Sequence, residues 1–155
     1  LTWREGIALV WDRETLAPLD RISYRGEGWG LCYDGSRLVM SDGSARLTLR
    51  DARTLERLGH LRVSDGSRPV RQLNELECAE GWIFANVLGS DRIARIDPTD
   101  GRVTAWIDAS GLLAPDVRRR ADVLNGIAYR QESESFYLTG KLWPTVFEVV
   151  FEPGA

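Results

Sequence analysis

Histidine, lysine and cysteine are almost absent from this 155-residue sequence, which holds one histidine (His60), one lysine (Lys141) and two cysteines, Cys32 and Cys78. A zinc site or a catalytic relay needs partner ligands, and His60 has no second histidine to join it. Serine-triad and zinc-hydrolase readings therefore lose most of their support. The two cysteines have no metal-site spacing and form no disulfide framework, so we expect two small buried thiols.

Long apolar runs and an excess of positive charge are also missing. No apolar segment approaches the roughly 20 residues that span a bilayer, and the N-terminus lacks the basic and apolar blocks of a signal peptide. The formal net charge is −3, and residues 118–120 form the only basic cluster. We therefore expect no nucleic-acid partner and no membrane partner.

The single lysine is informative because nineteen of the twenty basic residues are arginine. A sequence that uses arginine wherever a generic cation serves would keep lysine where a compact ammonium is required, or where the planar guanidinium does not fit. Lys141 is therefore a candidate functional residue on composition alone.

The composition and the repeated strand pattern of the sequence predict one globular domain built from repeats. Hydrophobic residues make up 43% and charged residues 28%. Three segments, 30–51, 75–97 and 126–150, each read as strand, tight turn, strand, polar interruption and strand, and outer strands follow the first two at 57–63 and 102–109. Four short strands per 40 to 50 residues is typical of a β-propeller blade, so we predict an all-β propeller.

The opening segment, residues 1–24, fits the back half of a further blade, which brings the chain to about three and a half blades. Residues 1–3 read as the middle of a strand without a starting Met, which suggests that residues precede them. Propellers usually need about four to eight blades. We therefore expect residues 1–155 to be a single propeller domain, the C-terminal portion of a longer propeller whose open edges need missing blades or another chain. Residues 111–122 interrupt the repeats and predict an inserted loop or helical turn.

Polar residues recur at equivalent places in the repeats, where a propeller channel should open. Segments 27–30, 73–77 and 123–128 superpose at the start of the innermost strand, and segments 40–44, 84–88 and 138–143 superpose at the end of the next strand. We call these six segments the channel mouth. Within it, Asn74 and Lys141 are the strongest candidates, and Trp29 stands between two glycines that leave its ring accessible.

Other residues have simpler structural interpretations. Large rings at strand positions usually pack between sheets, so we place Trp11, Trp82 and Trp106 in the core. Asp42 is expected in a turn, and Asn86 and Asn125 are expected to tie loops.

An ordered series of motifs resembles one family. The motifs are LTW (1–3), EGWGL (27–31), SDGS (41–44), LNELE (73–77), ANV (85–87), NGIAY (125–129) and TGKLWP (139–144). They resemble the glutaminyl-peptide cyclotransferases of the plant and bacterial type. The resemblance implies a five-bladed β-propeller, unrelated to the zinc-dependent animal enzymes, that acts without a metal or cofactor. Its acyltransferase activity would convert the N-terminal glutamine of peptides or proteins to pyroglutamate with release of ammonia, in a secreted or periplasmic protein.

The resemblance also implies roles for individual residues. Trp3 and Trp29 would wall the substrate site, and Asn74 would donate to the oxyanion or orient the substrate. Lys141 would supply a compact positive charge to the oxyanion or to a neighbouring carboxylate. Leu88 occupies a substrate-facing position where the family typically has tryptophan. The family's YESTG motif, with its acid–base glutamate, and its FTQGL motif do not occur in this sequence.

Two other functions stay open at this point. One is a non-catalytic propeller that binds peptides at the channel mouth, which Leu88 and the missing glutamate favour. The other is a metal-dependent lactonase or esterase of the propeller type, in which Glu and Asn side chains ring a divalent ion. That reading leaves Lys141 without a role.

Overall fold

The protein is all-β apart from one helical turn. The computed structural model describes residues 1–152, so residues 153–155 of the predicted domain lie outside the described residues. The elements are β1 (Ile7–Trp11), β2 (Pro18–Ser23), β3 (Leu31–Tyr33), β4 (Leu38–Met40), β5 (Arg46–Arg50), β6 (Arg57–Arg62), β7 (Ser64–Asp65), β8 (Arg68–Pro69), β9 (Leu73–Ala79), β10 (Trp82–Val87), β11 (Arg92–Ile96), β12 (Val103–Asp108), α1 (Pro115–Arg118), β13 (Leu124–Arg130), β14 (Ser135–Gly140) and β15 (Phe147–Val149).

Two of the predicted repeats are complete four-stranded blades. The first has the strand order β3-β4-β5-β6, and the second has the order β9-β10-β11-β12, all antiparallel. Glu80 and Gly81 form a two-residue hairpin turn with positive φ at both positions, 53° and 78°. That turn geometry matches the right-handed twist of the flanking strands, which explains why a Glu-Gly pair connects β9 to β10. The predicted outer strands correspond to β6 and β12.

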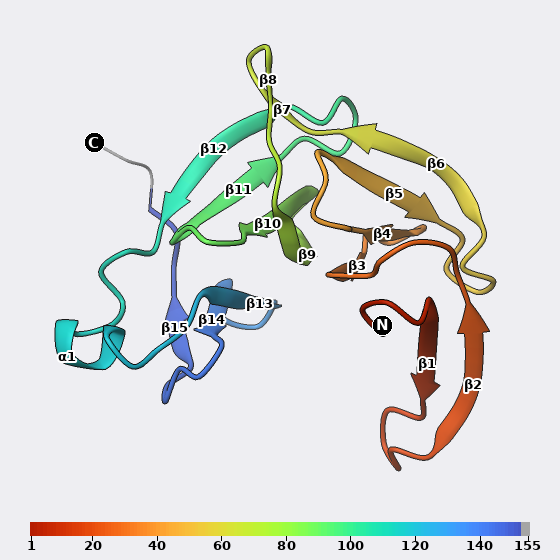
Figure 1. Ribbon diagram of the computed structural model, residues 1–155, viewed down its shortest axis with the longest axis horizontal. Coiled ribbons are helices and arrows are strands. Elements are labelled where there is room, and N and C mark those ends of the chain that lie inside the picture. The colour runs from red at the N-terminus through yellow and green to blue at the C-terminus, as the bar shows by residue number, and fades with distance from the viewer. Residues whose placement is uncertain (153–155) are drawn as a thin grey trace.

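The remaining sheets are partial blades arranged on an arc with the complete ones (Figure 1). The third repeat forms the three-stranded sheet β13-β14-β15, and the opening segment forms the two-stranded sheet β1-β2, as predicted. In Figure 1, β3, β9 and β13 lie toward the middle of the arc and β6 and β12 lie on its outside. The propeller-type fold is therefore confirmed. A short hairpin of β7 and β8 adds a feature that the repeats did not predict.

Residues 1–3 are not the middle of a strand, which corrects one prediction. Residues 1–6 form no regular element. The Thr2 main-chain N–H donates to the Ile7 carbonyl (2.8 Å), and the Ile7 N–H donates to the Thr2 hydroxyl (3.0 Å). Because these two bonds close a loop back onto β1, Trp3 lies in a turn beside the first strand of the chain.

Apolar side chains fill the spaces between neighbouring sheets. One buried cluster joins the two complete blades, a second joins the second blade to β13–β15, and a third joins β1–β2 to the first blade. Trp106 and Trp82 pack against the first and second clusters. Trp11 is 51% exposed, so its predicted place in the core was wrong. Its two-stranded sheet offers few neighbours against which a ring can pack.

The two cysteines form a disulfide between blades, which corrects the expectation of free thiols. Cys32 lies on β3 and Cys78 on β9, with a Cα–Cα distance of 5.5 Å and a sequence separation of 46 residues. That distance falls within the range that a disulfide requires. The innermost strands of the two complete blades are therefore covalently linked.

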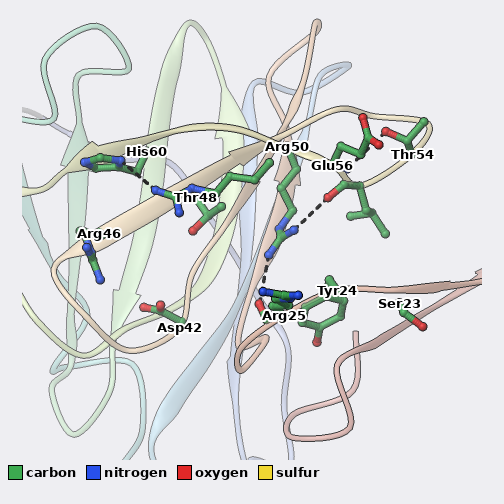
Figure 2. A pocket seen from close by; sticks show the side chains of 12 residues that line it. Ser23, Tyr24, Arg25, Asp42, Arg46, Thr48, Arg50, Thr54, Glu56 and His60 are labelled. Carbon is green, nitrogen blue, oxygen red and sulfur yellow. Dashed lines mark hydrogen bonds between the residues drawn. The ribbon is translucent and has the colours of Figure 1, made fainter.

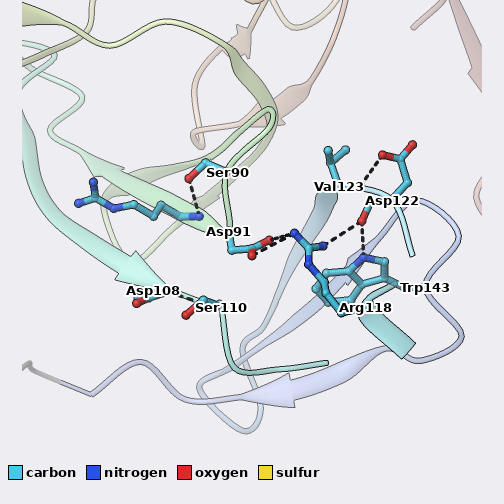
Figure 3. Close-up of polar contacts among 9 residues, drawn as sticks. Ser90, Asp91, Asp108, Ser110, Arg118, Asp122, Val123 and Trp143 are labelled. Carbon is cyan, nitrogen blue, oxygen red and sulfur yellow. Dashed lines mark hydrogen bonds and ion pairs between the residues drawn. The ribbon is translucent and has the colours of Figure 1, made fainter. Parts of the chain in front are cut away.

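The insertion at residues 111–122 contains α1, as predicted, and is fastened by one arginine (Figure 3). The Arg118 guanidinium donates to both carboxylate oxygens of Asp91, at 2.9 and 3.1 Å, and to the Asp122 carbonyl at 3.2 Å. The Trp143 indole donates to the same carbonyl (2.9 Å), so the insertion is joined to the loop after β14. Among residues 1–152 no helix has the length and apolar character to cross a membrane.

Candidate functional site

The starts of the innermost strands β3 and β9 lie in direct contact, as their superposition in the sequence predicts. A side chain at Gly30 would overlap the Asn74 carbonyl oxygen, so only glycine permits this approach. The buried Ser41 hydroxyl donates to the same carbonyl oxygen at 2.6 Å. The main chain of Asn74 is therefore fixed by the neighbouring blade.

A second contact joins β9 to β13. The Glu75 main-chain N–H donates to the Asn125 side-chain oxygen at 3.3 Å, so Asn125 ties two blades together. Leu124 pairs with Gly140, which places the segment before Lys141 beside the start of β13. The three strand starts and the end of β14 thus form one continuous region, as predicted for the channel mouth.

Glu27 holds the two tryptophans that the sequence singled out. The indole N–H groups of Trp3 and Trp29 donate to one carboxylate oxygen of Glu27, at 2.7 and 2.8 Å. The hydrogen bond from Trp29 lowers the pKa of Glu27 most, and the hydrogen bond from Trp3 lowers it further. Because a side chain at Gly43 would overlap the Trp29 ring, that ring rests on the Gly43 backbone.

Sequence reasoning missed the role of Glu27. The signal was present, since a carboxylate two residues before Trp29 opens the EGWG segment. Nothing in the sequence indicated that its partner would be Trp3, 24 residues earlier.

Asn74 has an available carboxamide. The residue is 6% exposed, and its recorded hydrogen bond from Ser41 goes to its main-chain carbonyl, while its amide atoms are not among the fully buried atoms that lack a partner. An amide group with accessible atoms and no partner in the neighbouring side chains can offer both its donor and its acceptor to a ligand. Asn86, at 0% exposure on β10, has both amide atoms buried without a partner in the described chain, so it does not tie a loop as predicted.

Lys141 is exposed but its main chain is fixed. Its N–H donates to the Val123 carbonyl (3.0 Å) and its carbonyl accepts from the Asp122 N–H (2.9 Å). No ion pair of Lys141 occurs within the part of the chain that the structure describes. The ammonium is therefore free to meet a negative group.

Leu88 belongs to the same region through its backbone. Its N–H donates to the Gln72 carbonyl (2.8 Å), and the Gln72 N–H donates to the carbonyl of Gly43, beneath Trp29 (2.8 Å). Within residues 1–152, the indoles of Trp3 and Trp29 donate to Glu27, and no side-chain hydrogen bond joins Lys141 to them or to Asn74. Main-chain contacts, together with the Ser41 hydroxyl and the Asn125 side-chain oxygen, thus bring the segments of the mouth together.

Two carboxylates follow Asn74 on β9 in a poorly solvated setting. Burial raises the pKa of Glu75, and burial likewise raises the pKa of Glu77, with the negative charge of Glu75 adding to the effect on Glu77. The hydrogen bond that links the start of β9 to Asn125 comes from the main-chain N–H of Glu75. The carboxylate of Glu75 takes no part in that bond. Within residues 1–152 no group of three or more His, Cys, Asp or Glu side chains is arranged to hold a metal ion.

Comparisons with known proteins agree with the geometry. The family model described as glutamine cyclotransferase matches residues 1–151. The chain is 37% identical over 153 residues to a glutaminyl-peptide cyclotransferase of Arabidopsis thaliana, covering 96% of this chain and 48% of that protein. The crystal structure of Myxococcus xanthus glutaminyl cyclase matches with a TM-score of 0.88 and 41% identity, over 94% of this chain and 64% of that chain. The chain thus spans about half the length of the curated relative.

Proposed function

The chain belongs to the glutamine cyclotransferase family, and on that premise we propose that its protein converts N-terminal glutamine of peptides or proteins to pyroglutamate with release of ammonia. The observation that carries this proposal is the pairing of two tethered indoles, Trp3 and Trp29, with the unengaged carboxamide of Asn74 in one region. The reaction needs these two kinds of group. Aromatic walls fold the glutamine side chain back on its own amine, and a donor stabilises the oxyanion formed.

The reaction has a simple balance. The neutral α-amine attacks the γ-carboxamide carbon, and the carbonyl oxygen becomes an oxyanion. A proton passes from the attacking nitrogen to the leaving –NH2 group through the acid–base glutamate, the oxyanion re-forms the C=O bond, and the C–N bond breaks to release ammonia. Asn74 would donate an N–H to the oxyanion, and the compact ammonium of Lys141 would lower its energy further. No metal is required in this scheme.

One part of the family's machinery is proposed to lie elsewhere in the protein. The acid–base glutamate belongs to a motif that residues 1–155 lack, and we place it in a further blade. On this view residues 1–155 are the C-terminal portion of one longer propeller domain. Leu88, where the family has tryptophan, would leave a wider, less aromatic wall and shift the preference among residues that follow the glutamine.

Disulfides persist in oxidising compartments, so the Cys32–Cys78 bond supports a secreted or periplasmic location for the protein. This inference is independent of the enzyme activity and rests on the covalent link alone.

Lys141→Arg in the full-length protein is the variant that tests the proposed roles. If a compact ammonium is required, kcat/KM for a glutamine-initiated dipeptide amide should fall about a hundredfold or more, although the charge is kept. Asn74→Ala should lose a similar factor, while Arg68→Gln, on the hairpin of β7 and β8, should leave the rate unchanged. Wild-type rates in Lys141→Arg would remove the lysine from the mechanism. Peptide binding without ammonia release in the unmodified protein would favour a non-catalytic binding propeller.

A further inference from the structure

A strongly basic cavity lies between the end of β2 and the first complete blade (Figure 2). Its volume is about 440 Å³, within the range of small-molecule sites. Four arginines line it: Arg25, Arg46, Arg50 and Arg57. Trp3, Trp29, Asn74 and Lys141 do not line this cavity, whereas Asp42, from the channel-mouth segment 40–44, does.

The strand register gathers the basic groups on one face. Arg46, Thr48 and Arg50 alternate along β5, and side chains two residues apart share a face of a strand. On the neighbouring β6, His60 pairs with Thr48 and Arg57 pairs with Arg50. The cavity wall is therefore built into the sheet and does not depend on loops alone.

Arg50 is the buried member of the group. It is 6% exposed, and its guanidinium donates to the Leu55 carbonyl (2.8 Å) and to the Arg25 carbonyl (3.4 Å). Its Nε is buried without a partner within residues 1–152. Burial lowers the pKa of Arg50, and the positive charge of Arg57 lowers it further. A buried guanidinium beside a second one is costly unless a negative group balances it.

No such balance exists in the described chain. The lining carries four arginines and two carboxylates, Asp42 and Glu56, which gives a net charge of +2 with His60 neutral. None of the four arginines forms an ion pair within residues 1–152. Asp42 instead accepts a hydrogen bond from the Ser44 main-chain N–H (2.9 Å), as expected for a turn residue.

His60 and Thr48 add neutral donors. A guanidinium can only donate, so the contact between Arg57 and His60 Nδ1 (3.3 Å) makes Nδ1 the acceptor and leaves the proton on Nε2. His60 Nε2–H and the Thr48 hydroxyl are then available to an oxygen atom in the cavity. Guanidinium, imidazole and hydroxyl donors together are the groups that recognise oxyanions.

We propose that this cavity is a binding site for a small anion that carries carboxylate or phosphate groups. Arg46 and Arg57 supply charge from the accessible wall, and Arg50 supplies the fixed positive group behind them. The anion removes the mutual repulsion of the arginines and so stabilises the contact between β2 and the first blade.

Thermal unfolding of the full-length protein with inorganic phosphate, citrate or sodium chloride at matched ionic strength tests the site. Phosphate, citrate or both should raise Tm along a saturating curve, whereas chloride should not. A response to phosphate alone identifies a phosphate-bearing ligand, and a response to citrate alone identifies a carboxylate. Arg46→Gln and Arg57→Gln should each weaken the apparent Kd about tenfold, because each removes a charged donor.

Arg68→Gln is the matched control, since Arg68 is exposed and does not line the cavity. It should respond to the anions as the unmodified protein does. The two test arginines are also exposed, so their replacement should leave the fold intact, which circular dichroism checks. Absence of a saturating shift with both anions, or an equal shift in the Arg46→Gln/Arg57→Gln double variant, would overturn the proposal.

Discussion

At the scale of single residues, the carboxylate of Glu27 fixes the positions of the two tryptophans, Trp3 and Trp29. Each indole N–H needs an acceptor, and one carboxylate oxygen serves both. Arg4 also lies over the Trp3 ring, 3.9 Å from its centroid, so this exposed ring is held on one face and at its edge. Trp3 is 54% exposed, and without Glu27 its ring would be free to turn into solvent.

Glu27→Leu should release both indoles. We expect a change in tryptophan emission and a roughly three- to tenfold rise in KM, with a smaller effect on kcat, because the walls are misplaced while the reacting groups remain. Glu27→Gln keeps an acceptor oxygen, so its KM and emission should lie between those of the unmodified protein and those of Glu27→Leu. Glu14→Leu, at an exposed carboxylate, is the control for lost charge. An unchanged emission spectrum and KM in Glu27→Leu would show that the bridge has no positioning role.

Glu75 gives a pH-dependent prediction for stability. Burial raises its folded-state pKa, so between the ordinary glutamate value of about 4.3 and the folded value the native state binds more protons than the unfolded state. Stability therefore falls as pH rises through that window. Glu75→Gln should raise Tm by a few degrees at pH 7 and lose this advantage near pH 4. Thermal unfolding at pH 7 and at pH 4 measures this difference. An equal rise in Tm at both pH values would contradict a charge effect.

At the scale of strands and blades, the sequence predicted more than it did for single side chains. The repeat spacing located both complete blades, the outer strands and the insertion, because strand alternation and turn residues are local signals. The Cys32–Cys78 bond was not predicted, although its 46-residue separation is close to the repeat length and so places the two cysteines at similar positions of adjacent blades. Trp11 and Glu27 depend on which neighbours surround them, and local patterns do not carry that information.

The disulfide should contribute substantially to stability, because it links the innermost strands of two blades. Closing a loop of 46 residues stabilises by about 4 kcal/mol in the chain-entropy description. The Cys32→Ser/Cys78→Ser double variant should therefore unfold at a markedly lower denaturant concentration. A reductant should lower the stability of the unmodified protein and leave that of the double variant unchanged. Two free thiols in the denatured, unreduced protein would contradict the bond.

At the scale of the whole molecule, the sheets form an open arc with β1–β2 and β13–β15 at its two ends (Figure 1). Unpaired strand edges favour association with other chains. We expect residues 1–155 alone to self-associate and a version extended upstream to be monomeric, and light scattering after size-exclusion chromatography measures both. A compact monomer of the 155-residue chain would contradict the proposal of a larger propeller.

The central claim is tested most directly by ammonia release from a glutamine-initiated dipeptide amide. The assay compares residues 1–155 with the version extended upstream to the start of its gene, each with a chelator present. Because the acid–base glutamate is placed outside these residues, we predict turnover by the extended protein alone, unaffected by the chelator. An extended protein that binds the peptide but releases no ammonia, or that loses activity with the chelator, would contradict a metal-free cyclotransferase.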